Sequence, residues 1–144
     1  MGELLAMELG DVVVWKSDMD GLDVPILLEN WSQIYESVDV IWIEIHPFLA
    51  PTSLPDIKKL STLLLESKFQ GVLFDNYGCV VGSGRERSLG DLVFNNCEKM
   101  ATKSRRLQRS PYYFDLIVFK SSIGSMQTIE RLMGTLNPIK FGCL

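Results

Sequence analysis

The chain has few of the residues that mark specialised classes of protein. Its 144 residues include three cysteines and a single histidine, and the formal net charge is -4. General nucleic-acid binders usually carry a basic surface, so we expect no nucleic-acid partner. No apolar run approaches the roughly 18 residues that a membrane span needs, so we expect no membrane partner either. The 47% hydrophobic content instead predicts a globular domain with a real core.

The cysteines and the first residues bear on the cellular compartment. Cys79, Cys97 and Cys143 are odd in number and far apart, which favours neither a disulfide framework nor a zinc site. The first five residues lack the basic stretch of a signal peptide. We therefore expect three reduced thiols and a cytoplasmic location.

One stretch near the amino terminus combines an apolar run with an abrupt polar corner. Residues 12–15 are Val-Val-Val-Trp, and Lys16 to Gly21 then bring a lysine and two aspartates. A short continuous apolar run of this kind is typical of a strand that is buried on both faces. In open α/β sheets the carboxyl ends of the strands bind ligands, so the polar corner is a candidate site.

The rest of the chain predicts an α/β fold in which helices and strands alternate. Helices are expected over 22–35, 53–68 and 88–102, and strands over 38–46, 71–74, 79–81 and 112–119, the last of them antiparallel. Asn76-Tyr77-Gly78 predicts a tight hairpin, and 82–87 a loop. We assign 1–121 to one domain, with a short helix over 3–9, and 122–144 to a weakly helical tail.

Four segments resemble the signatures of FkbM-type methyltransferases. Lys16–Gly21 resembles their K-x-D-x-[DE]-G corner, and Ile43–Pro47 resembles the end of their next strand. Phe74–Gly78 and Tyr112–Ile117 are similar to their later signatures and follow in the same order. The resemblance covers roughly residues 10 to 120. Four short motifs in order are more specific than any one of them.

The resemblance implies a fold and an activity. The fold would be a partial class I methyltransferase (Rossmann-like) sheet, mostly parallel with one antiparallel last strand and with helices on both faces. The activity would be O-methyl transfer from S-adenosylmethionine to a hydroxyl of a small molecule or glycan.

The cofactor-binding part of the family pattern has no counterpart in this sequence. Gly82-Ser83-Gly84 does not replace the Gly-rich loop, because it neither follows a predicted strand directly nor opens a helix with the fingerprint spacing. We therefore expect the carboxyl-terminal half of a methyltransferase, beginning just before the fourth strand. Its cofactor-binding residues stay unassigned, and the isolated chain is expected to be inactive.

The candidate site residues follow the predicted strand ends. Asp18, Glu44 and His46 are the candidate catalytic residues, since a histidine of pKa about 6.5 suits a base near neutral pH and a carboxylate can orient it. The candidate substrate-binding residues are Lys16, Asp20, Asp75 and Asn76.

Each of these residues also has a purely structural interpretation. Asp18 and Asp20 precede a glycine and suit a turn or a helix cap. His46 could make only a local hydrogen bond at a strand end, and Asp75-Asn76 could serve the hairpin. Glu44 lies within an apolar run, where burial of its charge requires a specific partner.

Two other classes of function stay open at this point. The chain could be a non-catalytic relic or an interaction module with a methyltransferase-like fold. It could also be a metal-dependent enzyme, since Asp18, Asp20, Glu44 and His46 would suit a divalent cation. Their spacing matches no metal motif, so no metal site is predicted. Residues 12–15 are expected to support self-association, because a strand without a neighbour exposes unpaired backbone groups.

Overall fold

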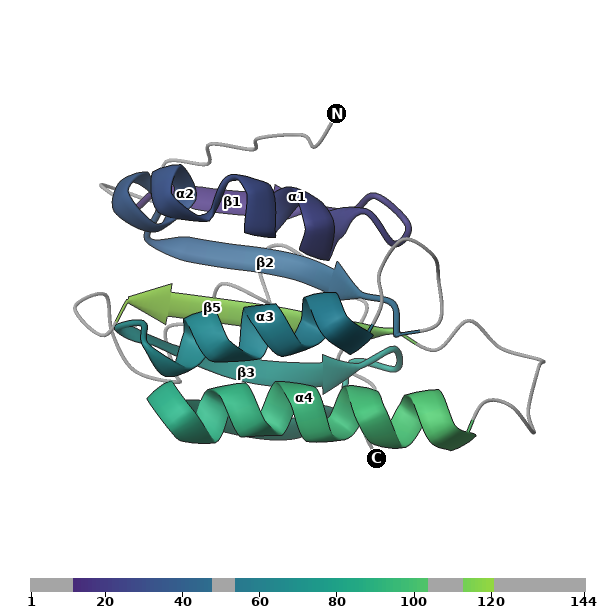
Figure 1. Ribbon diagram of the computed structural model, residues 1–144. Helices are drawn as coiled ribbons and strands as arrows, with labels where there is room; N and C mark the ends of the chain where they lie inside the picture. The colour runs from purple at the N-terminus through teal and green to yellow at the C-terminus, as the bar shows by residue number, and fades with distance from the viewer. Residues whose placement is uncertain (1–11, 48–53, 104–112, 121–144) are drawn as a thin grey trace.

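The computed structural model describes residues 12–47, 54–103 and 113–120. These ranges form a single five-stranded sheet with four helices (Figure 1). In chain order the elements are β1 (Val14–Ser17), α1 (Asp23–Glu29), α2 (Trp31–Ser37), β2 (Val40–Ile45), α3 (Leu54–Leu65), β3 (Phe69–Asp75), β4 (Val80–Arg85), α4 (Glu86–Lys103) and β5 (Phe114–Lys120).

The sheet is mixed, in the spatial order β1-β2-β5-β3-β4. The predicted α/β class and the antiparallel last strand are confirmed, because β5 runs antiparallel to both β2 and β3. The expectation of a mostly parallel sheet is wrong. Only β1 and β2 pair in parallel, and the other three pairings are antiparallel. The reason is that β5 lies between β2 and β3, which run in the same direction but never touch as neighbours.

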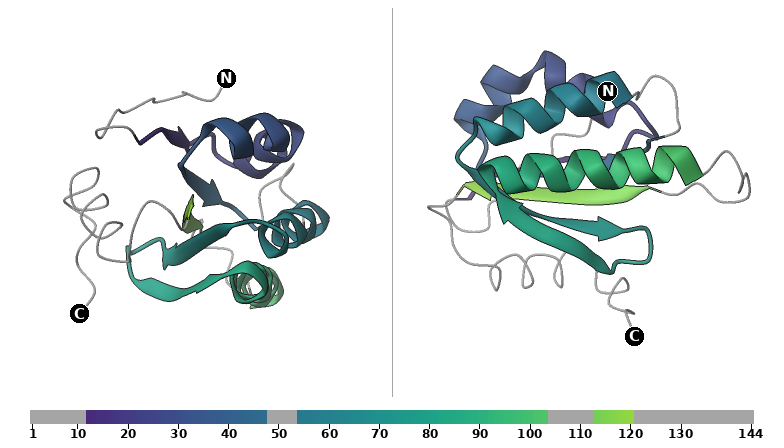
Figure 2. Two further views of the ribbon diagram at one scale, coloured as in Figure 1. Left: turned by 90° about the vertical axis from the view of Figure 1, so that its left-hand side faces the viewer. Right: turned by 60° about the horizontal axis from the view of Figure 1, so that its bottom comes forward.

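The four described helices all lie on one face of the sheet (Figure 2). They bury the larger core cluster, in which Leu27, Ile57 and Leu89 are fully buried against the strands. A second cluster lies on the opposite face and includes Trp42 and Ile117, at most 1% exposed. The expectation of helices on both faces is therefore wrong for the described part of the chain.

The helix predicted over 22–35 is in fact two short helices that meet at Asn30. Asn30 has a non-helical backbone (φ -113°, ψ 15°), and its side-chain amide donates to the Ile26 carbonyl at 2.9 Å. A side chain that competes with the backbone in this way ends a helix. Pro25 lies in the first turn of α1, as predicted, where it removes no helical hydrogen bond.

The glycines of the predicted loop 82–87 lie instead within strand β4. A Cβ added at Gly82 would lie 2.6 Å from Leu92, and one at Gly84 would lie 2.7 Å from the Ser88 hydroxyl. These glycines therefore permit α4 to pack directly over the strand, a role that sequence alone did not distinguish from a loop signal. Helix α4 also begins earlier than predicted, at Glu86.

Two of the cysteines behave differently from each other. Cys97 is free and buried, and burial raises the pKa of its thiol to about 12. Cys79 is disulfide-bonded, so the expectation of three reduced thiols is wrong for this residue. Disulfides persist mainly in oxidising compartments, which weighs against the cytoplasmic location predicted above.

Some predictions fall on residues that the structure does not describe. The helix predicted over 3–9, the tail over 122–144 and Cys143 lie outside the described residues. Within the described ranges, none of the helices combines the length and the apolar character that crossing a bilayer would require.

The close packing of α3 against α4 at Gly90 generates a stability prediction. A Cβ at this position would lie 2.6 Å from the backbone oxygen of Ser61, whose hydroxyl donates to the Gly90 carbonyl at 2.8 Å. We expect Gly90→Ala to lower the free energy of unfolding by about 1–3 kcal/mol, because the helices must separate. Urea unfolding measures the change. Asn95→Ala, at an exposed position of the same helix, is the matched control and should be neutral or stabilising, and equal behaviour of the two variants would contradict the prediction.

Strand β1 lies at one edge of the described sheet, and β4 lies at the other. Val14 and Trp15 are buried in opposite clusters as predicted, but the strand runs from Val14 to Ser17 rather than over 12–15, and Val13 is exposed. No described strand pairs with the outer side of β1, and such edges favour pairing between chains. We expect self-association through residues 12–15, measured by sedimentation at micromolar concentration.

Two lysine substitutions separate this edge from the opposite one. Val13 (36% exposed) lies beside β1, and Val81 (37% exposed) lies in β4. Val13→Lys should shift the chain toward monomer, because an edge lysine opposes strand pairing, whereas Val81→Lys should not. A wild-type chain that sediments as a monomer, or the reverse order of the two variants, would show that β1 is not the interface.

Candidate functional site

The ends of four strands meet at one edge of the sheet. Strands β1, β2 and β3 run in the same direction and end there, and β5 begins there because it runs the opposite way. Ser17 lies opposite Ile43, and Phe114 lies opposite both Ile45 and Asp75. The four segments that resemble the FkbM signatures, which are far apart in the sequence, therefore lie along a single edge.

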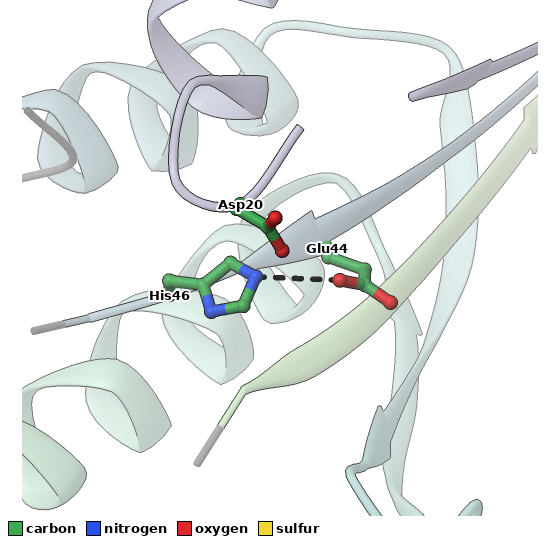
Figure 3. Close-up of side chains that lie close together, drawn as sticks. All are labelled: Asp20, Glu44 and His46. Carbon is green, nitrogen blue, oxygen red and sulfur yellow. Dashed lines mark hydrogen bonds and ion pairs between the residues drawn. The ribbon is translucent and has the colours of Figure 1, made fainter. Parts of the chain in front are cut away.

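Three of the predicted site residues converge at this edge. Asp20, Glu44 and His46 each place one carboxylate oxygen or ring nitrogen so that these atoms all lie within 4.8 Å of one another (Figure 3). Asp20 comes from the loop after β1, and the other two come from β2 and the residue that follows it. The expectation that these strand-end residues meet is confirmed for these three.

Glu44 and His46 form a hydrogen-bonded pair. The Glu44 Oε2 atom lies 3.3 Å from His46 Nε2, and the two side chains are 15% and 7% exposed. Positions two apart in a strand point to the same face, which explains why the pair forms. The His46 ring also contacts the Tyr113 ring, with 5.4 Å between centroids.

The loop after β1 holds Asp20 through a left-handed turn. Asp20 and Gly21 have φ angles of 47° and 105°, and aspartate and glycine tolerate this region better than most residues. Both carboxylate oxygens of the buried Asp23 accept the Met19 N–H, at 3.2 and 3.3 Å. Asp23 thus makes a carboxylate hydrogen bond in this turn, the structural role that the sequence suggested for Asp18 and Asp20.

Two further acidic residues flank Glu44. The exposed Asp18 lies close enough to raise the pKa of Glu44. Asp115 lies directly opposite Glu44 in the β2–β5 pairing, is only 1% exposed and accepts the Trp42 indole N–H at 3.1 Å. Asp115 was missed from the sequence, although an acid inside the apolar run 114–119 was a visible signal.

The surroundings raise the pKa values of both members of the pair. For Glu44 the largest cause is burial, which the hydrogen bond from His46 opposes and the charges of Asp115 and Asp18 reinforce. For His46 the largest cause is the hydrogen bond to Glu44, which burial opposes and the charges of Glu44, Asp23 and Asp20 reinforce. Both groups of the pair therefore bind a proton more tightly than they would in isolation.

Lys16 lies one strand away from the pair on the same face as Trp42. Its ammonium is 4.4 Å from the centroid of the Trp42 ring, its register partner in β2. A cation over an indole face is a favourable arrangement. The substrate-binding role of Lys16 stays a prediction.

Asp75 and Asn76 lie apart from the cluster, because β5 separates β3 from β2. Asp75 Oδ1 accepts the backbone N–H groups of Tyr77 and Cys79, both at 2.9 Å. The geometry of the tight hairpin predicted at 76–78 is confirmed, with Gly78 at φ 83°. The structural interpretation therefore accounts for Asp75, and we do not include Asp75 or Asn76 in the candidate site.

Comparison with known proteins does not assign the chain. No family model, no curated protein and no solved structure matches this sequence. The FkbM likeness therefore remains a resemblance of four short segments.

The Glu44–His46 contact generates a prediction on proton binding. We expect Glu44→Gln to lower the pKa of His46, because the substitution removes the charge that favours imidazolium while burial still opposes it. His46 is the only histidine, so its ring proton gives a single resonance to titrate by NMR. Glu36→Gln, at an exposed position of α2, is the control. An unchanged His46 pKa in Glu44→Gln would show that the pair does not interact in solution.

The raised pKa of His46 also predicts how the stability of the fold changes with pH. A histidine whose pKa is raised by folding stabilises the folded state below its unfolded pKa of about 6.5, and that stabilisation is lost as the pH rises through the folded pKa. The raised pKa of Glu44 acts in the same direction. The wild-type free energy of unfolding should therefore fall more steeply than that of Glu44→Gln as the pH rises above 6.5.

Proposed function

We propose that this chain is the acceptor-binding part of an FkbM-type methyltransferase that transfers a methyl group from S-adenosylmethionine to a hydroxyl of a small molecule or glycan. The observation that carries the proposal is the meeting of the four resembling segments at one sheet edge. Such an edge is also where α/β sheets bind ligands.

The cluster at this edge supplies what O-methyl transfer requires of the acceptor side. A bond forms between the acceptor oxygen and the methyl carbon, the bond from that carbon to the sulfonium sulfur breaks, and the hydroxyl proton must leave. In our proposal His46 Nδ1, the ring nitrogen that does not face Glu44, accepts this proton, and the Glu44 carboxylate, 3.3 Å from Nε2, stabilises the imidazolium that results. Asp18 and Asp20 are placed to accept hydrogen bonds from neighbouring hydroxyls of the acceptor.

The proposal assigns no cofactor-binding residues. The resemblance places S-adenosylmethionine on family segments that have no match in these 144 residues. The antiparallel β5 supports the proposal, since the resemblance implied a last strand of this direction.

Two substitutions in the cluster test the proposal. We expect His46→Ala and Asp18→Asn to reduce methyl transfer by about 10²–10⁴-fold, the usual contribution of a positioned acid–base group. The measurement is release of tritiated methyl from S-adenosylmethionine to a panel of glycan and small-molecule hydroxyls. The assay uses this chain and, in parallel, the product of the longest transcript that encodes it.

Separate controls check that each variant is folded and that the cofactor binds. Asp56→Asn, on α3 at the helix-covered face, should leave turnover unchanged, and thermal unfolding checks that each variant is folded. If His46→Ala or Asp18→Asn retained wild-type turnover, that residue would return to its structural role. If neither protein transferred methyl to any acceptor while binding the cofactor, the assignment to this reaction would fail.

A further inference from the structure

The side chains of Asp20, Glu44 and His46 form a set of donors that all point toward one place (Figure 3). Each offers one donor atom, and these atoms lie within 4.8 Å of one another. Two ligands bound on opposite sides of one metal ion, each about 2.0–2.2 Å from it, are separated by at most about 4.4 Å. A small rotation of the exposed Asp20 side chain would bring all three atoms within this range.

This set differs from an ordinary group of surface acids in its nitrogen donor. His46 is 5% exposed, and its ring is held between the Glu44 carboxylate and the Tyr113 ring. Its Nε2 atom, rather than its hydrocarbon edge, is turned toward the carboxylates. A buried imidazole that points into a carboxylate cluster is a typical ligand for a transition metal.

We propose that Asp20, Glu44 and His46 bind a divalent first-row transition-metal cation such as Mn²⁺ or Zn²⁺. Two carboxylate oxygens with one imidazole nitrogen suit these ions, whereas Mg²⁺ and Ca²⁺ favour sites made of oxygen alone.

The residues around the cluster are arranged to hold these ligands. The Asp18 carboxylate lies close to Glu44, and the buried Asp115 faces Glu44 across the sheet. Carboxylates behind the ligands orient them and add negative charge that a cation would offset. Asp23 anchors the turn that carries Asp20 by accepting the Met19 N–H.

The inference stands on this geometry and does not depend on methyl transfer. If both proposals hold, the acceptor hydroxyl would coordinate the cation, which lowers the pKa of a bound hydroxyl. In that case His46 would be a metal ligand. The cation, rather than His46, would then promote loss of the proton from the acceptor hydroxyl.

Titration of the purified 144-residue chain with Mn²⁺ alone tests the inference. Free Mn²⁺ is counted by its electron paramagnetic resonance signal, with no S-adenosylmethionine and no acceptor present, so the result is independent of the proposed reaction. We expect one site with a dissociation constant below about 100 μM. Asp20→Asn and His46→Gln should each weaken it by about tenfold or more, the least that loss of a group supporting a metal site usually costs.

The variants are chosen so that a change of fold does not imitate loss of the site. Asparagine tolerates the left-handed backbone of position 20 as aspartate does, so Asp20→Asn should fold normally. Glu36→Gln, at an exposed acid on α2, should bind Mn²⁺ like the wild type. Mn²⁺ should also raise the wild-type unfolding temperature, and raise that of Asp20→Asn less.

Two results would overturn the inference. One is a wild-type chain that does not bind Mn²⁺ below about 1 mM, the range of weak, unspecific association. The other is binding that Asp20→Asn and His46→Gln leave as tight as in Glu36→Gln, which would place the cation elsewhere on this acidic chain.

Discussion

The pairing of β5 with two neighbours is the constraint on which the rest of the structure depends. Strand β5 lies between β2 and β3 and forms a continuous antiparallel ladder with each of them. Without β5, no backbone hydrogen bonds between the described strands would connect the β1–β2 pair to the β3–β4 hairpin. Because β5 runs against its neighbours, it begins where they end. That reversal brings Tyr113 and Asp115 to the same edge as Glu44 and His46.

The chemistry of the edge follows from acidic groups held close together in partly buried positions. Glu44 and Asp115 face each other directly across β2 and β5, an arrangement that costs stability when both carry charge. The structure offsets part of this cost by giving each acid a hydrogen-bond donor. His46 is the donor for Glu44, and the Trp42 indole is the donor for Asp115. Groups retained at such a cost are more often functional than groups on an open surface. A proton and a metal cation are the two species that would reduce the repulsion between these acidic groups. The two proposals correspond to these two species.

The local elements were largely predictable, and the errors have identifiable causes. The buried strand Val40–Ile45 followed from its apolar run, and the hairpin at 76–78 followed from Asn-Tyr-Gly. The strand part of 82–85 was missed because glycine signals a loop locally, whereas here it admits the side chains of α4. The break at Asn30 was missed because a single non-helical residue does not disturb the helical spacing of the apolar residues on either side of it. Nothing in the local sequence around Cys79 indicated its disulfide, since a disulfide depends on the position of a distant partner.

The sequence by itself determined which residues are apolar and where polar residues follow strands. From this pattern, Asp18, Asp20, Glu44, His46, Asp75 and Asn76 were expected to gather at one edge. These features depend on neighbours along the chain, where periodicity and turn chemistry act. Only the tertiary structure decided that β5 enters between β2 and β3, that the sheet is mixed, and that Asp115 joins the cluster while Asp75 serves a hairpin. Strand order is set by pairing between residues far apart in sequence. For Asp115, that means a partner in β2 that lies 71 positions away, at Glu44.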